Sequence, residues 1–140
     1  MIQIVVRAII AQEDKLLLVR NKSTDFWCLP GGKVDEDEQI IPALKREITE
    51  ELGVEPVLGK LLYVQQLFLP TEQRLEFLFA VENSADYANL DLTKTTHGEL
   101  ELDDAGFYDP QKLKVLPSFL TEFRQDMSKD LPLFKVESKV

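Results

Sequence analysis

Residues 32 to 54 read Gly-Lys-Val-Asp-Glu-Asp-Glu-Gln-Ile-Ile-Pro-Ala-Leu-Lys-Arg-Glu-Ile-Thr-Glu-Glu-Leu-Gly-Val, and much of this segment has helical periodicity. The apolar side chains that recur at spacings of three and four are Ile41, Leu44, Ile48 and Leu52. Proline is tolerated in a first helical turn, where the N–H groups have no partner inside the helix. Pro42 therefore predicts a helix that begins near Gln39 or Ile40. Gly53 follows the last turn and suits a C-terminal cap.

Three glutamates of this segment, Glu47, Glu50 and Glu51, stand at positions i, i+3 and i+4, which are neighbours on a helix. Like-charge neighbours repel by a few tenths of a kcal/mol per pair, and a hard divalent cation relieves that repulsion. Oxygen ligands without a nearby histidine or cysteine favour magnesium or manganese over zinc. From the spacing alone, the alternative interpretation is a solvated acidic face.

The residues around these acids are suited to binding an anion. Gly31 and Gly32 have no Cβ and let the backbone approach a ligand closely. Arg46 points away from the apolar stripe, so it pairs with an acid or clamps a phosphate with two hydrogen bonds. The sequence leaves both roles of Arg46 open.

The segment resembles the Nudix box, Gly-x5-Glu-x7-Arg-Glu-U-x-Glu-Glu-x-Gly-U, where U is a bulky aliphatic residue. The matching positions are Gly32, Glu38, Arg46, Glu47, Ile48, Glu50, Glu51, Gly53 and Val54. The preceding Trp27-Cys-Leu-Pro-Gly-Gly32 resembles the segment that commonly enters the box. The resemblance implies an α+β fold, in which a mixed β-sheet is sandwiched between α-helices, and one Nudix hydrolase domain over residues 1–140.

The resemblance also implies roles for the site residues. Glu47, Glu50 and Glu51 become the expected ligands of Mg²⁺, with Mn²⁺ as the alternative. Glu38 and Arg46 are expected to brace the loop and the helix, Gly31 and Gly32 to lie near the substrate, and Glu47, Glu50 and Arg46 to take part in catalysis.

Glu50 is the first candidate for the general base, which deprotonates the attacking water. In some family members the base comes from a later loop, where Glu99 and Glu101 are the candidates. The favoured alternative for Glu99-Leu-Glu-Leu102 is an ordinary strand with its acids in water. His97, the only histidine, is expected to be a solvated loop residue.

The sequence says less about the substrate. Pro70 lies sixteen positions after Val54, and by family resemblance a proline near that distance accompanies hydrolases of ADP-ribose or nucleotide sugars. A turn between two strands explains Pro70 equally well. We therefore keep three hypotheses: cleavage of a nucleoside diphosphate linked to another moiety, release of pyrophosphate from a nucleoside triphosphate, and nucleotide sensing without catalysis.

Outside this segment, the patterns predict strands, a hairpin and a second helix. Strands are expected over residues 2–10, 15–20, 57–68 and 74–82, with a last short strand at 107–108. Residues 15–20 are read as the second arm of a hairpin. Apolar residues from Leu116 to Met127 recur at helical spacing, and an exposed remainder of that stripe would serve a homodimer.

Charge and composition limit the partners. The chain of 140 residues carries a net charge of −9, which disfavours nucleic acid polymers and anionic membranes but not a small nucleotide beside a cation. Arg7 interrupts the apolar start of the chain, which we read as a strand rather than a signal peptide. With a single cysteine, Cys28, and no apolar run of about 18 residues, we expect a cytoplasmic protein.

Overall fold

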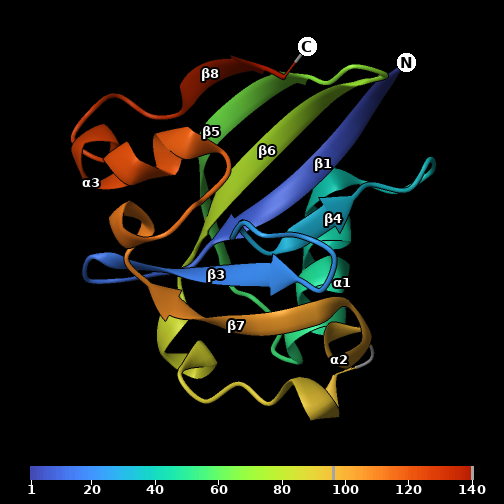
Figure 1. The fold of residues 1–140 in the computed structure, drawn as a ribbon, viewed down its shortest axis with the longest axis vertical. Coiled ribbons are helices and arrows are strands. Elements are labelled where there is room, and N and C mark those ends of the chain that lie inside the picture. Colours follow the sequence, from blue (N-terminus) through green and yellow to red (C-terminus); the bar gives the residue numbers. More distant parts are fainter. Residues whose placement is uncertain (96, 140) are drawn as a thin grey trace.

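The computed structural model describes residues 1–95 and 97–139, and its strands form two sheets (Figure 1). The larger sheet contains, in spatial order, β4 (Gly31–Lys33), β1 (Ile2–Ile9), β6 (Gln73–Val81), β5 (Leu58–Phe68) and β8 (Leu133–Ser138). The pairs β1–β6 and β5–β8 are parallel, whereas β1–β4 and β5–β6 are antiparallel. The larger sheet is therefore mixed, as predicted.

The smaller sheet is antiparallel and contains β2 (Ala11–Gln12), β3 (Lys15–Asn21) and β7 (Leu102–Tyr108). The helices are α1 (Ile40–Leu52), α2 (Gly98–Glu101) and α3 (Phe123–Asp126). Short 3-10 helices join these elements: η1 (Ser84–Tyr87), η2 (Leu92–Lys94), η3 (Pro110–Lys112) and η4 (Ser118–Glu122).

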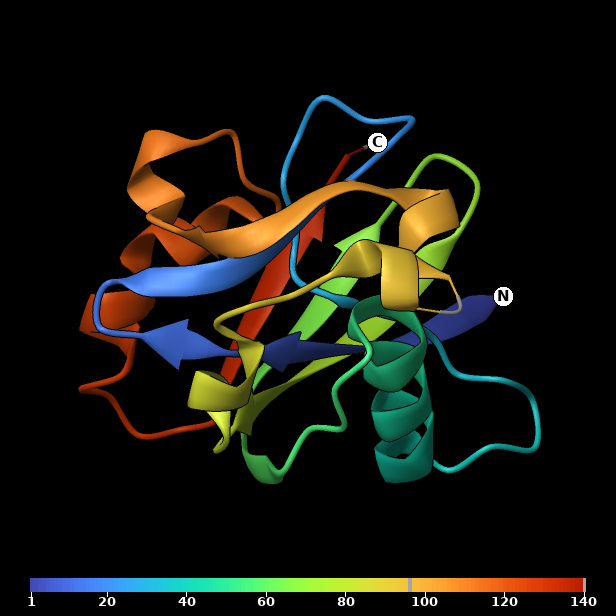
Figure 2. The ribbon, with the colours of Figure 1, turned by 90° about the horizontal axis from the view of Figure 1, so that it is seen from below.

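Two apolar clusters cover the two faces of the larger sheet. Val6 and Ala8 of β1 pack in one cluster with Leu44 and Ile48 of α1. Ile9 packs in the other cluster, with residues of β5 and β6 and with Phe119 and Leu120 of η4. This arrangement follows from the strand period, which sends successive side chains to opposite faces. In Figures 1 and 2, α1 and α3 lie on opposite sides of the molecule, and the predicted α+β class is confirmed.

The helix that carries the acids matches its predicted bounds. It begins at Ile40 and ends at Leu52, with Pro42 in the first turn. Gly53 has a φ of 79° and donates its N–H to the carbonyl of Thr49 at 2.9 Å. Ile41 is exposed, and Ala43 is buried in the core instead, because the helix turns its apolar face slightly from the predicted stripe.

The N-terminal half of the chain departs from the hairpin prediction. β1 lies in the larger sheet, and the hairpin arm that pairs with β3 is the two-residue strand β2. The chain thus passes from one sheet to the other around Ile10.

The C-terminal half departs from the prediction in two ways. Residues 116 to 127 form η4 and α3 rather than one helix. Pro117 stands at the N-cap of η4, and a residue that precedes proline is disfavoured in helical conformation, so Leu116 lies outside. The strand β8 follows and was not predicted, so β7 is not the last strand.

The described residues contain no helix that has both the length and the apolar character to cross a membrane.

Candidate active site

Glu51 is the most buried of the three neighbouring glutamates Glu47, Glu50 and Glu51, which we call the acidic cluster. It is 6% exposed, and its Oε1 accepts a hydrogen bond from the N–H of Gly31 at 3.0 Å. Burial raises the pKa of Glu51 from 4.5 to about 8, although the Gly31 N–H and the Arg7 charge oppose that rise. Glu51 thus joins α1 to the start of β4, where its negative charge is poorly solvated.

Glu47 lies one turn earlier on α1, against Gly32 of β4. A Cβ at position 32 would stand 2.5 Å from the Glu47 carboxyl carbon, so any other residue would force this side chain to move. Burial also raises the pKa of Glu47, and the neighbouring Arg46 opposes this effect. Gly32 therefore lets the Glu47 carboxylate lie against the backbone of β4, and the N–H of Gly31 holds the carboxylate of Glu51.

Arg46 connects the loop before α1 to the acidic cluster. Its Nε and Nη2 donate to the two oxygens of Glu38 at 2.7 and 2.8 Å. Glu38 Oε1 also accepts from the N–H of Asp35 at 3.1 Å, and the Arg46 contact lowers the pKa of Glu38 to about 2. The third nitrogen, Nη1, donates to Glu47 at 3.1 Å and to Glu50 at 3.3 Å.

The segment after residue 96 packs directly on the acidic cluster. The N–H of His97 donates to the carbonyl of Glu50 at 3.0 Å, and His97 Nδ1 lies 3.0 Å from Glu50 Oε2. A Cβ on Gly98 would collide with the carbonyl oxygen of Glu51, so only glycine permits this approach. His97 is therefore not simply a solvated loop residue.

Glu99 and Glu101 belong to α2, not to the alternating strand that the sequence favoured. The strand β7 begins only at Leu102. The charge of Glu101 contributes to the raised pKa values of both Glu47 and Glu51, so Glu101 lies within electrostatic reach of the cluster.

The donor atoms of the acidic cluster suit a hard cation, but they do not converge in this structure. Among residues 1–95 and 97–139, no three histidine, cysteine, aspartate or glutamate side chains form a ready metal site. The reason lies in the contacts already described, since Gly31 holds Glu51, Arg46 holds Glu47 and Glu50, and His97 holds Glu50. A cation would have to draw these carboxylates away from those partners.

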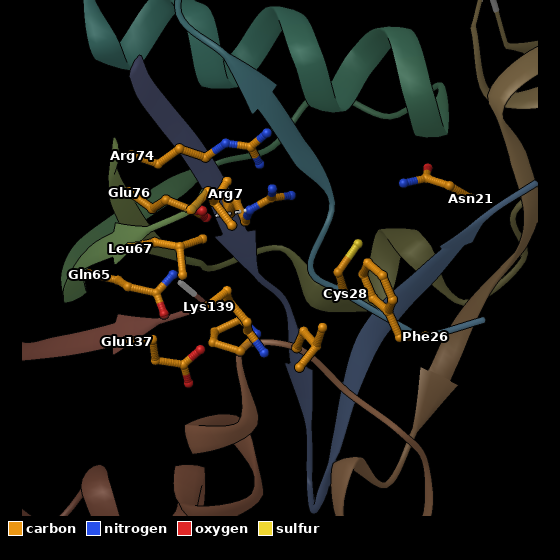
Figure 3. Close-up of a pocket in the computed structure, with 13 residues that line it drawn as sticks. Arg7, Asn21, Phe26, Cys28, Gln65, Leu67, Arg74, Glu76, Glu137 and Lys139 are labelled. Carbon is orange, nitrogen blue, oxygen red and sulfur yellow. Dashed lines mark hydrogen bonds and ion pairs between the residues drawn. The ribbon is translucent and has the colours of Figure 1, made fainter. Parts of the chain in front are cut away.

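A cavity of about 370 Å³ is lined in part by Arg7 (Figure 3), whose charge acts on Glu51 of the acidic cluster. Its lining includes Arg7, Phe26, Cys28, Gln65 and Glu76. In the sequence, Arg7 only interrupts an apolar strand, and a charged residue within such a strand is the signal that could have pointed to this cavity.

Arg7 connects this cavity to the cluster. Its Nε donates to Glu76 at 2.7 Å and its Nη1 to the carbonyl of Leu29 at 3.0 Å. Its charge also acts on Glu51, whose pKa it lowers.

A family model described as NUDIX domain matches residues 1–131. The chain is 34% identical over 87 residues to a putative 8-oxo-dGTP diphosphatase of Bacillus subtilis, which covers 62% of this chain and 57% of that protein. It is 42% identical over 60 residues to the CTP pyrophosphohydrolase of Escherichia coli, and the aligned region covers 40% of this chain and 44% of that protein. The match thus spans about half the length of these curated relatives.

Solved structures agree with the family match. The solution structure of the E. coli ORF135 protein superposes with a TM-score of 0.69 at 25% identity, over 91% of this chain and 89% of that one. The chain belongs to the Nudix family, and the fold expected from its box is confirmed.

Proposed function

We propose that this protein hydrolyses a diphosphate bond of a small nucleotide with the help of a divalent cation. The observation that carries the proposal is the acidic cluster, in which burial raises the pKa of Glu47 and Glu51 beside two glycines. An apolar or amide residue would fill these positions at lower free energy, since burying a carboxylate is unfavourable. A bound cation supplies the missing compensation.

Glu47, Glu50 and Glu51 would hold the cation, which we propose to be Mg²⁺ with Mn²⁺ as the alternative. When bound, the cation neutralises phosphate oxygens and lowers the pKa of the attacking water. Arg46 fixes Glu38 and the first part of the loop, and it positions Glu47 and Glu50. Gly31 and Gly32 are proposed to lie near the diphosphate, with the Glu47 carboxylate in the space beside Gly32 in this structure.

A carboxylate accepts the proton from the attacking water. Glu50 is our first candidate, because it is the most exposed member of the cluster at 26%. Glu101 is the second, because its charge acts on Glu47 and Glu51.

We place nucleoside triphosphates first among the substrates, with pyrophosphate as the leaving product. The names of the two relatives, an 8-oxo-dGTP diphosphatase and a CTP pyrophosphohydrolase, support this choice. A nucleoside diphosphate linked to another moiety, such as ADP-ribose or a nucleotide sugar, is the second candidate and depends on Pro70. Pro70 is exposed in the turn between β5 and β6, where Leu69 and Glu72 share a backbone hydrogen bond of 2.8 Å, so its role as a turn residue suffices.

We further propose that residues 1–140 form one domain, because both apolar clusters draw on residues from the two halves of the chain. Homodimer formation and a cytoplasmic location stay predictions from the sequence.

The test begins with EDTA-treated protein and a panel of nucleoside triphosphates, ADP-ribose, nucleotide sugars and dinucleoside polyphosphates. Turnover is expected only after Mg²⁺ or Mn²⁺ is restored, and chromatography of the products identifies the bond cut. Glu47→Gln, Glu50→Gln and Glu51→Gln are each expected to lower kcat at least about a hundredfold, which corresponds to about 3 kcal/mol of transition-state stabilisation.

Glu36→Gln is the matched control, because Glu36 is an exposed glutamate of the loop before α1 and should leave kcat unchanged. Unchanged turnover in all three cluster variants would show that the site is misplaced. Metal-dependent nucleotide binding with no turnover of any panel member would instead favour a sensor.

A further inference from the structure

Gln65 of β5 has an unsatisfied polar group inside the cavity. The side chain is 1% exposed, and its Oε1 is the one buried side-chain polar atom without a hydrogen-bond partner among residues 1–95 and 97–139. Buried polar groups in folded proteins are almost always hydrogen-bonded, because an unpaired acceptor has lost its solvation without replacement. Such an atom in the lining of a cavity indicates a ligand that donates to it.

Glu76 supplies a second acceptor beside Gln65. The two residues are directly opposite each other on β5 and β6, so their side chains share one face of the sheet. Glu76 is 3% exposed, and Arg7 pairs with its Oε1 at 2.7 Å. An ionised carboxylate can only accept hydrogen bonds, so Glu76 adds a second acceptor to a side of the cavity that also carries the cations Arg7 and Arg74.

The opposite side of the cavity carries the aromatic ring of Phe26 and the thiol of Cys28, with the polar Asn21 farther out. Figure 3 shows Gln65 and Glu76 on one side, and Phe26 and Cys28 on the other. An aromatic ring offers a stacking surface to a nucleobase of any kind. The volume of about 370 Å³ lies within the range of small-ligand sites, and Arg7 places the cavity next to the acidic cluster.

We propose that this cavity binds the nucleobase of the substrate and that Gln65, with Glu76, selects a base that carries an exocyclic amino group. The inference deepens the proposed function and rests on it. An amino group donates to the Gln65 Oε1 and completes its hydrogen bonding. A base with an oxo group in the same place would set one acceptor against another, and Gln65 would stay unpaired.

The test measures equilibrium binding of nucleoside monophosphates by amide chemical-shift titration, without added metal. The matched pairs are CMP against UMP, and GMP or AMP against IMP, whose base lacks an amino group. Wild-type protein is expected to bind the amino-bearing member of at least one pair about tenfold more tightly, which is the usual effect of one buried hydrogen bond. Gln65→Leu should bind the two members of that pair with about equal affinity, because leucine offers no hydrogen-bond acceptor.

Two further variants make the result specific. Gln65→Met replaces the amide with an unbranched side chain that has no amide oxygen, and it should lose the same preference for amino-bearing bases. Because two different side chains are tested, a packing defect in one of them cannot decide the outcome. Gln66→Leu is the control, since Gln66 is next on β5, points to the opposite face and bonds to Gln73. It should keep the wild-type preference. Thermal unfolding checks that each variant is folded.

Equal affinity within every pair for the wild-type protein would overturn the inference. If both folded Gln65 variants still preferred the amino-bearing bases, the inference would be overturned as well. The Gln65 amide would then bind water and not the base. Because monophosphate binding needs no turnover, these outcomes are independent of the hydrolysis panel. Amino-selective binding without hydrolysis of any panel member would refute the proposed activity and not the selectivity of the cavity.

Discussion

Replacing Glu51 with glutamine is expected to remove most of the pH dependence of stability between pH 5 and 9 in the metal-free protein. Burial raises the pKa of Glu51 from 4.5 in the unfolded chain to about 8 in the folded protein. An acid whose folded pKa is raised binds its proton more tightly when folded. Its stabilising contribution is therefore complete below pH 4.5 and is lost as the pH rises toward and through 8.

The magnitude follows from the two pKa values. Each unit of difference corresponds to about 1.4 kcal/mol, so the interval between 4.5 and about 8 sets an upper bound of about 5 kcal/mol. Glu51 is 6% exposed, so solvent screening reduces this bound little, and a loss of several kcal/mol between pH 5 and 9 is expected. Glutamine has nearly the same shape, keeps an oxygen for the N–H of Gly31 and carries no charge.

Urea unfolding at pH 5 to 9 in the presence of EDTA measures this effect. Wild-type protein should lose stability with rising pH, whereas Glu51→Gln should lose much less and should be the more stable of the two at pH 8.5. The exposed control Glu36→Gln should follow the wild type within about 0.5 kcal/mol. Saturating Mg²⁺ should stabilise the wild type at pH 8.5 more than it stabilises Glu51→Gln, because a ligand that binds only the folded state stabilises it.

Other titrating groups do not obscure the comparison. Burial raises the pKa of Glu47 too, and its charge contributes to the raised pKa of Glu51, so the difference between wild type and variant includes the coupling of these two carboxylates. The lowered pKa values of Glu38 and Asp126 affect stability only at more acidic pH. If wild type and Glu51→Gln show parallel pH profiles, the burial argument for Glu51 is refuted.

Two more substitutions test the supports of the cluster. Arg46→Lys should destabilise the protein by about 1–2 kcal/mol in urea unfolding and lower kcat, since an ammonium cannot make the two parallel bonds to Glu38; unchanged stability would contradict the bracing role. Gly98→Ala should destabilise by about 1–3 kcal/mol, because its Cβ would collide with the carbonyl of Glu51. Hydrogen exchange at the His97 and Glu101 amides should then show faster opening of α2, and an unchanged exchange pattern would count against that packing.

The elements that sequence predicted well are those with local causes. The bounds of α1 follow from an apolar stripe, a proline that fits only a first turn and a glycine that ends the last turn. The strands β5 and β6 form a hairpin, so their pairing also depends on a short segment. The spacing of the acids is a property of the helix itself, so the order of residues along the chain is enough to place them on one face.

The features that sequence missed depend on contacts between distant segments. Glu99-Leu-Glu-Leu102 fits a strand by its alternation, but its first three residues form one helical turn with Gly98, and only Leu102 belongs to β7. In the structure this turn is α2, and Gly98 at the start of α2 packs against the carbonyl of Glu51. The strand β8 was missed because residues 133 to 138 are half-exposed and pair in parallel with β5 only after η4 and α3 have turned the chain.

The cavity and the acidic cluster share a feature that unites the two proposals. Glu47 and Glu51 bear charge where burial disfavours it, and Gln65 presents an acceptor with no donor. The buried charges and the unpaired acceptor each destabilise the folded protein when no ligand is bound. Residues that cost stability in this way concentrate at functional sites. A cation would compensate the carboxylates, and an amino group would compensate the amide. Arg7 joins the two regions, because it pairs with Glu76 beside Gln65 and its charge favours the ionised form of Glu51. Under the two proposals, a single nucleotide would compensate Gln65 with its base and, through the cation at its phosphates, the carboxylates of the cluster.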